Sequence, residues 1–509
     1  MMRAVAGLLV LGVVACAKPG TVESPNETPL QRQAQVAQIE GPDQTLERAR
    51  LASMALAVGE TDLAEKTLRQ VVQRVQDFRA DGEFRALVGQ ESRKEWKGDP
   101  SEKMMAFFYL GTLLLEKGDY GNALAMSKAA ILADTGTSRL QYRADFVPAY
   151  VLRALAYQGL GKAASAKTAI DEAVAAVRVR VLTGHLTALF ESATLPEEMA
   201  FDAGANAAAR ALLLEALPAG LRQHPDDPQA AVRATLSRAT ELREIVLDTR
   251  RRRRPGSLSA IRRSDARRAF DVLGPLAEAW RTIVADDAMA PLKDVAEAEG
   301  LLRGLVNDPP SLVLWLESGR APRRFRDGTH GQILRLQPWP AEPPPEVRLD
   351  GRSLAVHPLD SVAFQATTRG GRRIDGFLKG KAVFKDTASV LGAALLVTGD
   401  AMNDDAGAVV QLVGAALWLG GAIANPAADI RAWSQLPDRL WLVRAEPSPG
   451  SHRLTIGDRS YTVQVPDGGT VSHLIPGREP GGPATFGEPC RRCDPPPAEV
   501  PLAIPEPSR

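Results

Sequence analysis

Cysteine, aromatic side chains and net charge are all scarce in this sequence, and each shortage excludes a class of protein. The 509 residues include three cysteines, too few for a disulfide-stabilised scaffold. Aromatic residues make up 5% of the chain, so alanine, leucine and valine must form most of the core, as they do in helical repeats. The formal net charge of +1 gives no overall field, so we expect no nucleic acid among the partners. The length is enough for about two to four domains.

Sequence motifs for catalysis and for metal binding are missing as well. None of the six histidines lies in an HExxH pattern, and the chain has no GxSxG motif. Residues 159–162 are glycine-rich but do not form a phosphate-binding loop, because Ala163 follows the lysine where serine or threonine is required. We therefore expect no enzyme activity, no cofactor and no metal. An acid–base pair that the fold assembles from distant residues would leave no such motif.

The N-terminus has the pattern of a secretory signal. Residues 1–15 combine one early arginine, a short apolar core and a small residue before Cys16. Residues 13–16, Val-Val-Ala-Cys, resemble a bacterial lipobox, which implies a lipid anchor on Cys16. An ordinary signal peptide with an incidental cysteine is the alternative. Residues 16–43 are rich in proline and polar side chains and predict a flexible tether. The lack of aspartate after Cys16 favours the outer membrane, with the protein facing the periplasm.

Three stretches, residues 46–72, 106–134 and 149–174, share one pattern of small and apolar residues around a central glycine. The pattern resembles the tetratricopeptide repeat, in which small residues let paired helices approach and glycine forms the turn. The turn glycines are Gly59, Gly118 and Gly161. Alanine-rich helical hairpins of another kind are the alternative. We expect a helical repeat domain at residues 44–305 and a partner-binding surface on it.

The helical pattern continues less regularly in the second half of this domain. Further helices are predicted at residues 205–217, 228–247, 267–283 and 289–305. Breaks are predicted at Pro196, Pro218, Pro225 and Pro255. Residues 250–254 are five arginines in a row, which form either a solvated loop or a contact with the phosphates of anionic lipid or lipopolysaccharide.

Residues 306–475 change to the pattern of a small β-rich, sandwich-like domain. Strands are predicted at residues 312–316, 347–352, 361–366, 440–444, 451–456, 460–465 and 470–475. The fifth and sixth of these alternate around Gly457-Asp458, which predicts a hairpin. The expected fold class is therefore α+β, with a tetratricopeptide-like solenoid before the β-rich domain.

A helical hairpin inserted at residues 377–425 and a disordered tail at residues 476–509 complete the prediction. Residues 405–424 are apolar and long enough to span a bilayer, but Gln411 and the lack of a positive N-terminal flank favour a buried helical hairpin over a membrane-inserting or self-associating segment. The tail is rich in proline and contains Cys490 and Cys493. These two thiols are too few for a structural zinc site and favour a local disulfide.

Three short stretches resemble a family of largely uncharacterised bacterial outer-membrane lipoproteins. The stretches are residues 96–100, 314–324 and 426–437. Members of that family combine tetratricopeptide-like helices with a small β-containing domain, and are often encoded near lipoprotein activators of peptidoglycan synthases. The resemblance implies a role in the cell envelope.

These shared stretches supply the candidate partner-binding residues. They are Trp96, Lys97, Asp99, Glu317, Arg320, Arg323, Asp429, Arg431 and Trp433. The alternative is a structural role, in which the residues near 430 form an ion pair and an aromatic plug. In the same alternative, the residues near 320 fix the junction between the helical and β-rich parts.

The expected function is therefore that of a lipid-anchored scaffold in the cell envelope. Its protein partners would bind the helical repeats, and peptidoglycan or lipopolysaccharide are further candidate ligands. A peptidoglycan- or polysaccharide-related enzyme subunit, or an export component, is the alternative.

Overall fold

The computed structural model describes most of the chain between residues 27 and 477. The described residues are 27–76, 95–135, 145–191, 193, 202–248, 258, 261–287, 290–327, 333–368, 429–477 and 499–502. The signal peptide, Cys16, the arginines at 250–254, the hairpin at 377–425 and the pair Cys490 and Cys493 lie outside them. Those predictions remain untested.

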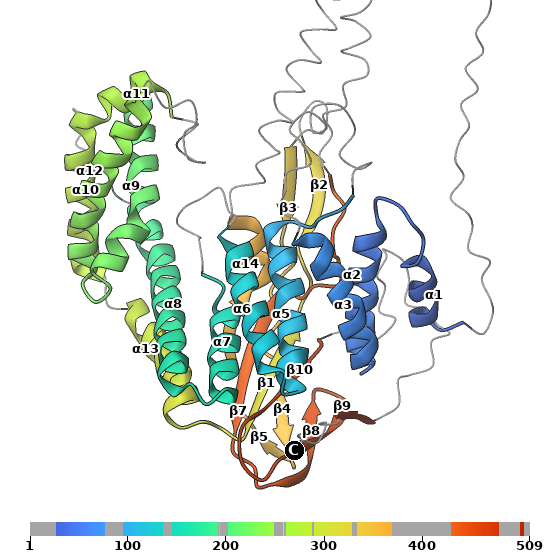
Figure 1. Ribbon diagram of the computed structural model, residues 1–509. Coiled ribbons are helices and arrows are strands. Elements are labelled where there is room, and N and C mark those ends of the chain that lie inside the picture. Colours follow the sequence, from blue (N-terminus) through green and yellow to red (C-terminus); the bar gives the residue numbers. More distant parts are fainter. Residues whose placement is uncertain are drawn as a thin grey trace, which may run out of the picture.

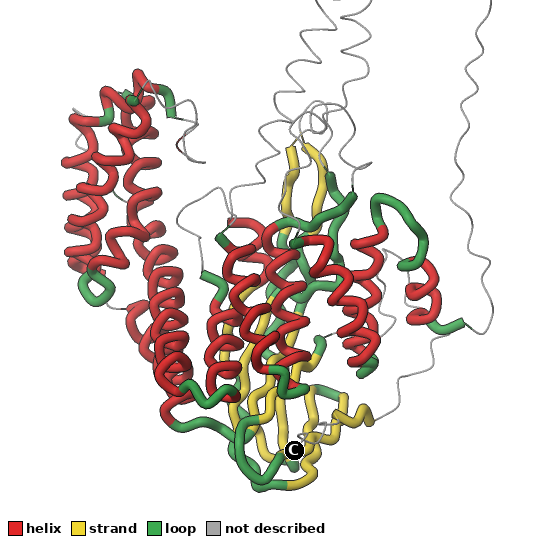
Figure 2. The backbone as a smooth tube through the Cα atoms, in the orientation of Figure 1, coloured by secondary structure: helices red, strands yellow, loops and turns green. Residues whose placement is uncertain are grey.

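The fold class is α+β, with paired helices in the N-terminal part and β-sheets in the C-terminal part (Figures 1 and 2). The helices are α1 (Pro29–Val36), α2 (Gln44–Ala57), α3 (Thr61–Val75), α5 (Pro100–Glu116), α6 (Tyr120–Asp134), α7 (Val147–Gly159), α8 (Ala163–Glu191), α9 (Ala203–Gln223), α10 (Pro228–Leu247), α11 (Arg263–Arg268), α12 (Phe270–Asp287), α13 (Ala290–Asn307) and α14 (Val362–Thr368). The strands are β1 (Leu312–Ser318), β2 (Arg323–Asp327), β3 (Ile333–Gln337), β4 (Val347–Leu349), β5 (Arg352–Ser353), β6 (His357–Ser361), β7 (Arg439–Ala445), β8 (Gly450–Ile456), β9 (Arg459–Val465), β10 (Val471–Ile475) and β11 (Glu499–Leu502).

Three helix pairs, α2–α3, α5–α6 and α7–α8, are joined by the same kind of turn. The turn glycines Gly59, Gly118 and Gly161 have φ angles of 79°, 76° and 70°, a conformation that glycine adopts without strain. In each turn the residue after the glycine donates its N–H to a carbonyl five residues back, over 2.8 to 2.9 Å. These bonds end the first helix of each pair with a Schellman-type cap. The predicted turn positions are confirmed.

Close helix contact in this region depends on the absence of a side chain at Gly111 in α5. A Cβ atom there would lie 2.5 Å from a methyl carbon of Leu152 in α7 and 3.2 Å from the Cβ of Met126 in α6. Any larger residue would push these helices apart. Glycine at position 111 is therefore a packing requirement.

Helix α8 contributes to two apolar cores. Its first half, including Ile170 and Val177, packs in the core of α2 to α7, and its second half, including Leu186 and Phe190, packs with α9 to α12. Residues Ala163–Phe190 are long and apolar enough to cross a membrane by length and composition alone, and 44% of the apolar window is buried inside the structure. The helix therefore joins a helical body to a smaller helical group, which Figure 1 shows beside it in green.

The structure corrects two expectations about the helical region. Helix α1 lies inside the predicted tether at 16–43, because Thr28 and Gln31 form a capping box around Pro29, and Gln33 bonds to α2. Pro218 does not break α9, although a proline inside a helix costs about 3 kcal/mol. The close packing of α9 on α10 outweighs that cost.

Two sheets share an apolar core in the C-terminal part. One has the strand order β10-β1-β7-β6, with β1 parallel to β10 and antiparallel to β7, and the other has the order β11-β9-β8-β4-β5. Val313 and Trp315 of β1 belong to the helical core, whereas Leu314 and Leu316 belong to the core between the sheets. Strand β1 is thus buried on both faces, which explains its continuous apolar run.

Most of the predicted strands are present, and two expectations are wrong. Of the strand predicted at residues 361–366, only Ser361 is in a strand, the end of β6, and residues 362–366 begin α14. Ser361 accepts a hydrogen bond from the backbone N–H of Phe364 and so caps the helix. The tail predicted to be disordered contributes β11, which pairs in parallel with β9. The hairpin of β8 and β9 turns at Gly457 as expected.

Candidate functional site

The structure brings together residues from all three shared stretches, although Arg324, from the stretch 314–324, is not one of the candidates. We call them, with one neighbour, the junction cluster: Asp99, Glu102, Arg324, Asp429, Arg431 and Trp433. Arg324 forms ion pairs of 2.9 Å with both Asp99 and Glu102, and Glu102 also accepts the backbone N–H of Trp433 at 2.7 Å. The cluster therefore connects the start of α5 to β2 and to the chain just before β7.

The charges of the junction cluster are buried and compensated. Burial raises the pKa of the Glu102 carboxyl, and Arg324 offsets part of that rise. Burial alone would lower the pKa of Arg324, but the two carboxylates raise it above its usual range. Arg431 pairs with Asp429 at 2.7 Å and with Asp43 at 2.8 Å. These side chains bind one another and leave little charge for an external partner.

The other candidate residues occupy different surroundings. Trp96 is 4% exposed and donates its backbone N–H to Pro42, while Lys97 is half-buried. Glu317 accepts a hydrogen bond from the hydroxyl of Tyr109 in α5. Arg320 and Arg323 are exposed and lie over the ring of Trp339, at 5.4 and 3.6 Å from its centroid. The arginine pair is thus separate from the junction cluster.

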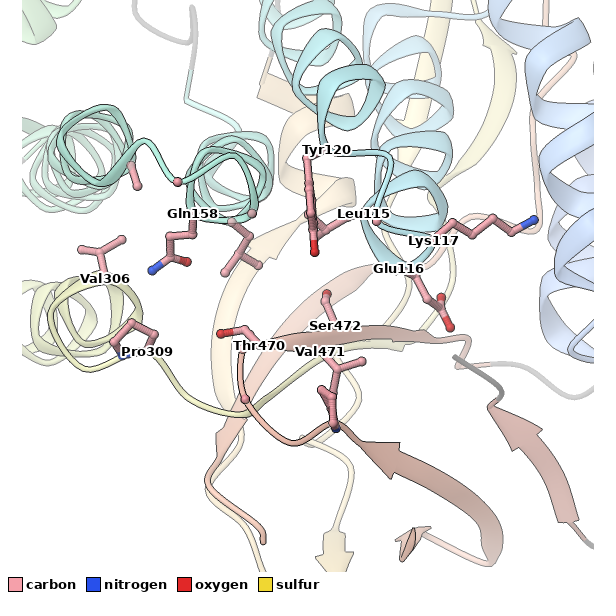
Figure 3. Close-up of a pocket in the computed structure, with 18 of the residues that line it drawn as sticks. Leu115, Glu116, Lys117, Tyr120, Gln158, Val306, Pro309, Thr470, Val471 and Ser472 are labelled. Carbon is pink, nitrogen blue, oxygen red and sulfur yellow. The ribbon is translucent and has the colours of Figure 1, made fainter. Parts of the chain in front are cut away.

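A cavity of about 650 Å³ lies at the opposite end of α5 (Figure 3). It is bounded by the α5–α6 and α7–α8 turns, the end of α13 and the loop between β9 and β10. Its apolar walls include Leu115, Leu155, Val306, Pro309, Pro466 and Val471. This volume lies within the usual range for small-ligand pockets, and we call it the turn pocket.

One buried polar atom of the residues that line the turn pocket has no hydrogen-bond partner. The amide of Gln158 donates to the carbonyl of Leu305 at 2.8 Å, but its Oε1 is buried and accepts no hydrogen bond. Tyr120 extends into the space between Gln158 and Ser472 (Figure 3). Gly159 makes room for that ring, since a Cβ there would come within 2.4 Å of it. The pocket thus offers a hydrogen-bond acceptor within apolar walls.

Glu116, the last residue of α5, is the anionic group of the pocket. One of its oxygens lies 2.8 Å from Nδ1 of His473, which is completely buried in β10. Nε2 of His473 is also buried and has no hydrogen-bond partner. This contact fixes one oxygen of the Glu116 carboxyl against β10.

The Glu116–His473 pair lacks the access to a substrate that a catalytic base needs. It resembles the base and orienting acid of a catalytic triad, but a catalytic base must reach its substrate. Among the described residues, no nucleophilic side chain is hydrogen-bonded to Nε2 of His473, and His473 has no exposed surface. The hydroxyl of Ser472, next in the strand, already accepts a 2.6 Å hydrogen bond from Trp315. The pair orients the carboxylate and does not present a reactive group.

Sequence reasoning identified the glycines of the turn pocket but not its polar residues. Gly118 and Gly161 carry a local backbone signal, whereas Glu116 and His473 are 357 positions apart and meet only in the fold. Gln158 has no distinguishing pattern in a helical sequence. Among the described residues, no group of three or more His, Cys, Asp or Glu side chains could hold a metal ion.

No protein-family model matches the chain, and comparison with curated proteins and with solved structures gives no match.

Proposed function

We propose that this protein is a non-enzymatic binding protein of the bacterial cell envelope, anchored by lipid on Cys16, that holds a segment of a partner protein in the turn pocket. The helices would form a tetratricopeptide-like solenoid, with the β-sheets as a sandwich-like support. The location rests on the lipobox-like residues 13–16.

One observation carries the binding role: the turn pocket is built from four separate elements, and one residue of its lining, Gln158, keeps an unused acceptor. Buried polar groups are normally hydrogen-bonded, and an unpaired one costs about 1–3 kcal/mol. The free Oε1 of Gln158 therefore favours a ligand that supplies a donor. The two repeat turns supply one side of the pocket, so the proposed ligand contacts the repeats themselves.

Site-specific photo-crosslinking tests this proposal. A benzophenone amino acid replaces Thr470, a residue of the pocket lining, in the acylated full-length protein inside living cells. The control position is Asp271, which is exposed on α12. We expect a defined adduct from position 470, none from position 271, and loss of the adduct when Ala163→Trp fills the pocket. An adduct that persists after filling, or none at position 470, would contradict the proposal.

The enzyme alternative receives less support from the same geometry. A hydrolytic site needs a base with access to water or substrate, and the only imidazole at the turn pocket among the described residues is fully buried. If the chain were instead a peptidoglycan-processing subunit, purified protein would release soluble fragments from isolated cell walls. We expect no such release.

A further inference from the structure

We propose that the turn pocket recognises an extended peptide segment with one lysine-like side chain, whose ammonium pairs with Glu116 and whose backbone donates an N–H to Gln158. This inference rests on the proposed function and adds the chemistry of the ligand. It assigns a separate role to each of the two polar sides of the pocket.

The charge balance of the lining supports a cationic side chain. Among the described lining residues, only Glu116 and Lys117 are charged. Lys117 points away from the pocket (Figure 3) and forms ion pairs of 2.6 Å with Asp62 and 2.8 Å with Glu65. His473 contacts one oxygen of Glu116 at 2.8 Å, and among the described residues no lysine or arginine pairs with this carboxyl. An ammonium can therefore bind the second oxygen of Glu116.

The shape of the pocket supports an extended chain between two polar ends. Gln158 and Glu116 lie on opposite sides of Tyr120 in Figure 3. A single small amine could satisfy one of them but not both. An extended peptide presents backbone N–H groups and side chains at regular intervals, so it can supply a donor to Gln158 and a cation to Glu116 together. Its aliphatic parts would cover Leu155 and Val306.

The lysine side chain suits Glu116 better than arginine because a single oxygen is available. His473 already bonds one carboxylate oxygen of Glu116. The planar fork of arginine gains most from two free oxygens, whereas an ammonium is a compact point charge. The methylene stem of lysine can also lie along apolar walls.

The test compares two peptides on the full mature chain with Cys16→Ser. The probes are acetyl-Ala-Leu-Lys-Leu-Ala-amide and the same peptide with norleucine in place of lysine, which removes only the ammonium. Isothermal titration calorimetry measures the affinity of each peptide for three proteins: the parent chain, Glu116→Gln and the control Asp271→Asn. Glutamine at position 116 can still accept the Nδ1–H of His473, so the variant removes charge and keeps the hydrogen bond.

We expect the parent chain and Asp271→Asn to bind the lysine peptide at least about tenfold more tightly than the norleucine peptide, the usual effect of one charge-assisted hydrogen bond. In Glu116→Gln this preference should disappear. Equal binding by the parent chain, a preference that survives in Glu116→Gln, or no binding of the lysine peptide would overturn the inference.

A ligand-side measurement checks the role of Gln158 without altering the protein. Each backbone N–H of the lysine peptide is methylated in turn, and we expect one position to lose at least about tenfold in affinity. An equal change in affinity on methylation at every position would refute a specific backbone donor to Gln158. If position 470 still gives a pocket-dependent adduct while the lysine peptide fails, the ligand chemistry is wrong and the proposed function stands. If both fail, the pocket is not a binding site.

Discussion

Replacing Arg324 by methionine should strongly destabilise the helical body. The side chain of Arg324 is 7% exposed and forms ion pairs of 2.9 Å with Asp99 and with Glu102. Removing it takes away the cation that forms ion pairs with both carboxylates, and breaking a buried pair in this way costs about 3–5 kcal/mol. With a urea slope of about 2 kcal/mol per molar, the unfolding midpoint should fall by roughly 2 M. Tryptophan fluorescence is a suitable measurement because Trp433 lies in the cluster.

The matched control is Arg348→Met, which removes an exposed arginine paired with Glu346. That pair should contribute only about 0–1 kcal/mol. The loss in Arg324→Met should also depend on pH, because burial already raises the pKa of Glu102 and the missing cation raises it further. A carboxyl whose pKa is raised in the folded protein lowers the free energy of unfolding once the pH exceeds its pKa in the unfolded chain. The difference in stability between the variant and the parent should therefore shrink as the pH falls toward about 4. A loss below about 1 kcal/mol at neutral pH, or a deficit that grows in acid, would refute this reasoning.

Three further predictions use simpler measurements. Gly159→Ala should lower the free energy of unfolding by about 1–3 kcal/mol, because its Cβ would clash with an aromatic ring, whereas Gly274→Ala, which meets open space, should stabilise by up to about 1 kcal/mol. Cys16→Ser should abolish labelling by radioactive palmitate and release the protein from membranes; membrane retention without label would point instead to an inserted segment. The pKa of His452 should lie above 6.5 by NMR, because Asp350 accepts its hydrogen bond, and Asp350→Asn should lower it. The stability from this pair should be present in acid and lost as the pH rises through the folded pKa of His452.

The parts of the fold that the sequence predicts are those set by local chemistry. Gly59, Gly118 and Gly161 mark turns because the left-handed conformation there favours glycine over every other residue. The apolar run in β1 indicates a strand with two covered faces, and both faces are covered. In each case the deciding interaction lies within a few residues, so the pattern is visible without knowledge of the fold.

The parts that the sequence does not predict depend on tertiary packing. Pro218 suggests a break, but the fit of α9 against α10 keeps the helix continuous. Arg324 has no local feature that distinguishes it from its exposed neighbour Arg323, yet one compensates two buried acids and the other lies over Trp339. The pairing of Glu116 with His473 is likewise set by which strand lies beside the end of α5. Such partners are separated by hundreds of residues, so their contact produces no local pattern in the sequence.

Helix α5 connects the junction cluster to the turn pocket. Its 17 residues span about 25 Å, with Glu102 in the first turn and Glu116 at the last position. Between them Phe108 packs edge-on against Trp315 of β1, with ring centroids 5.3 Å apart. Because the helix is fixed at its start, along its length and by His473 at its end, Glu116 is already in place before a ligand arrives. Binding at this carboxylate therefore needs little ordering of the protein, and affinity there should depend on the charge of the ligand more than on adjustment of the pocket.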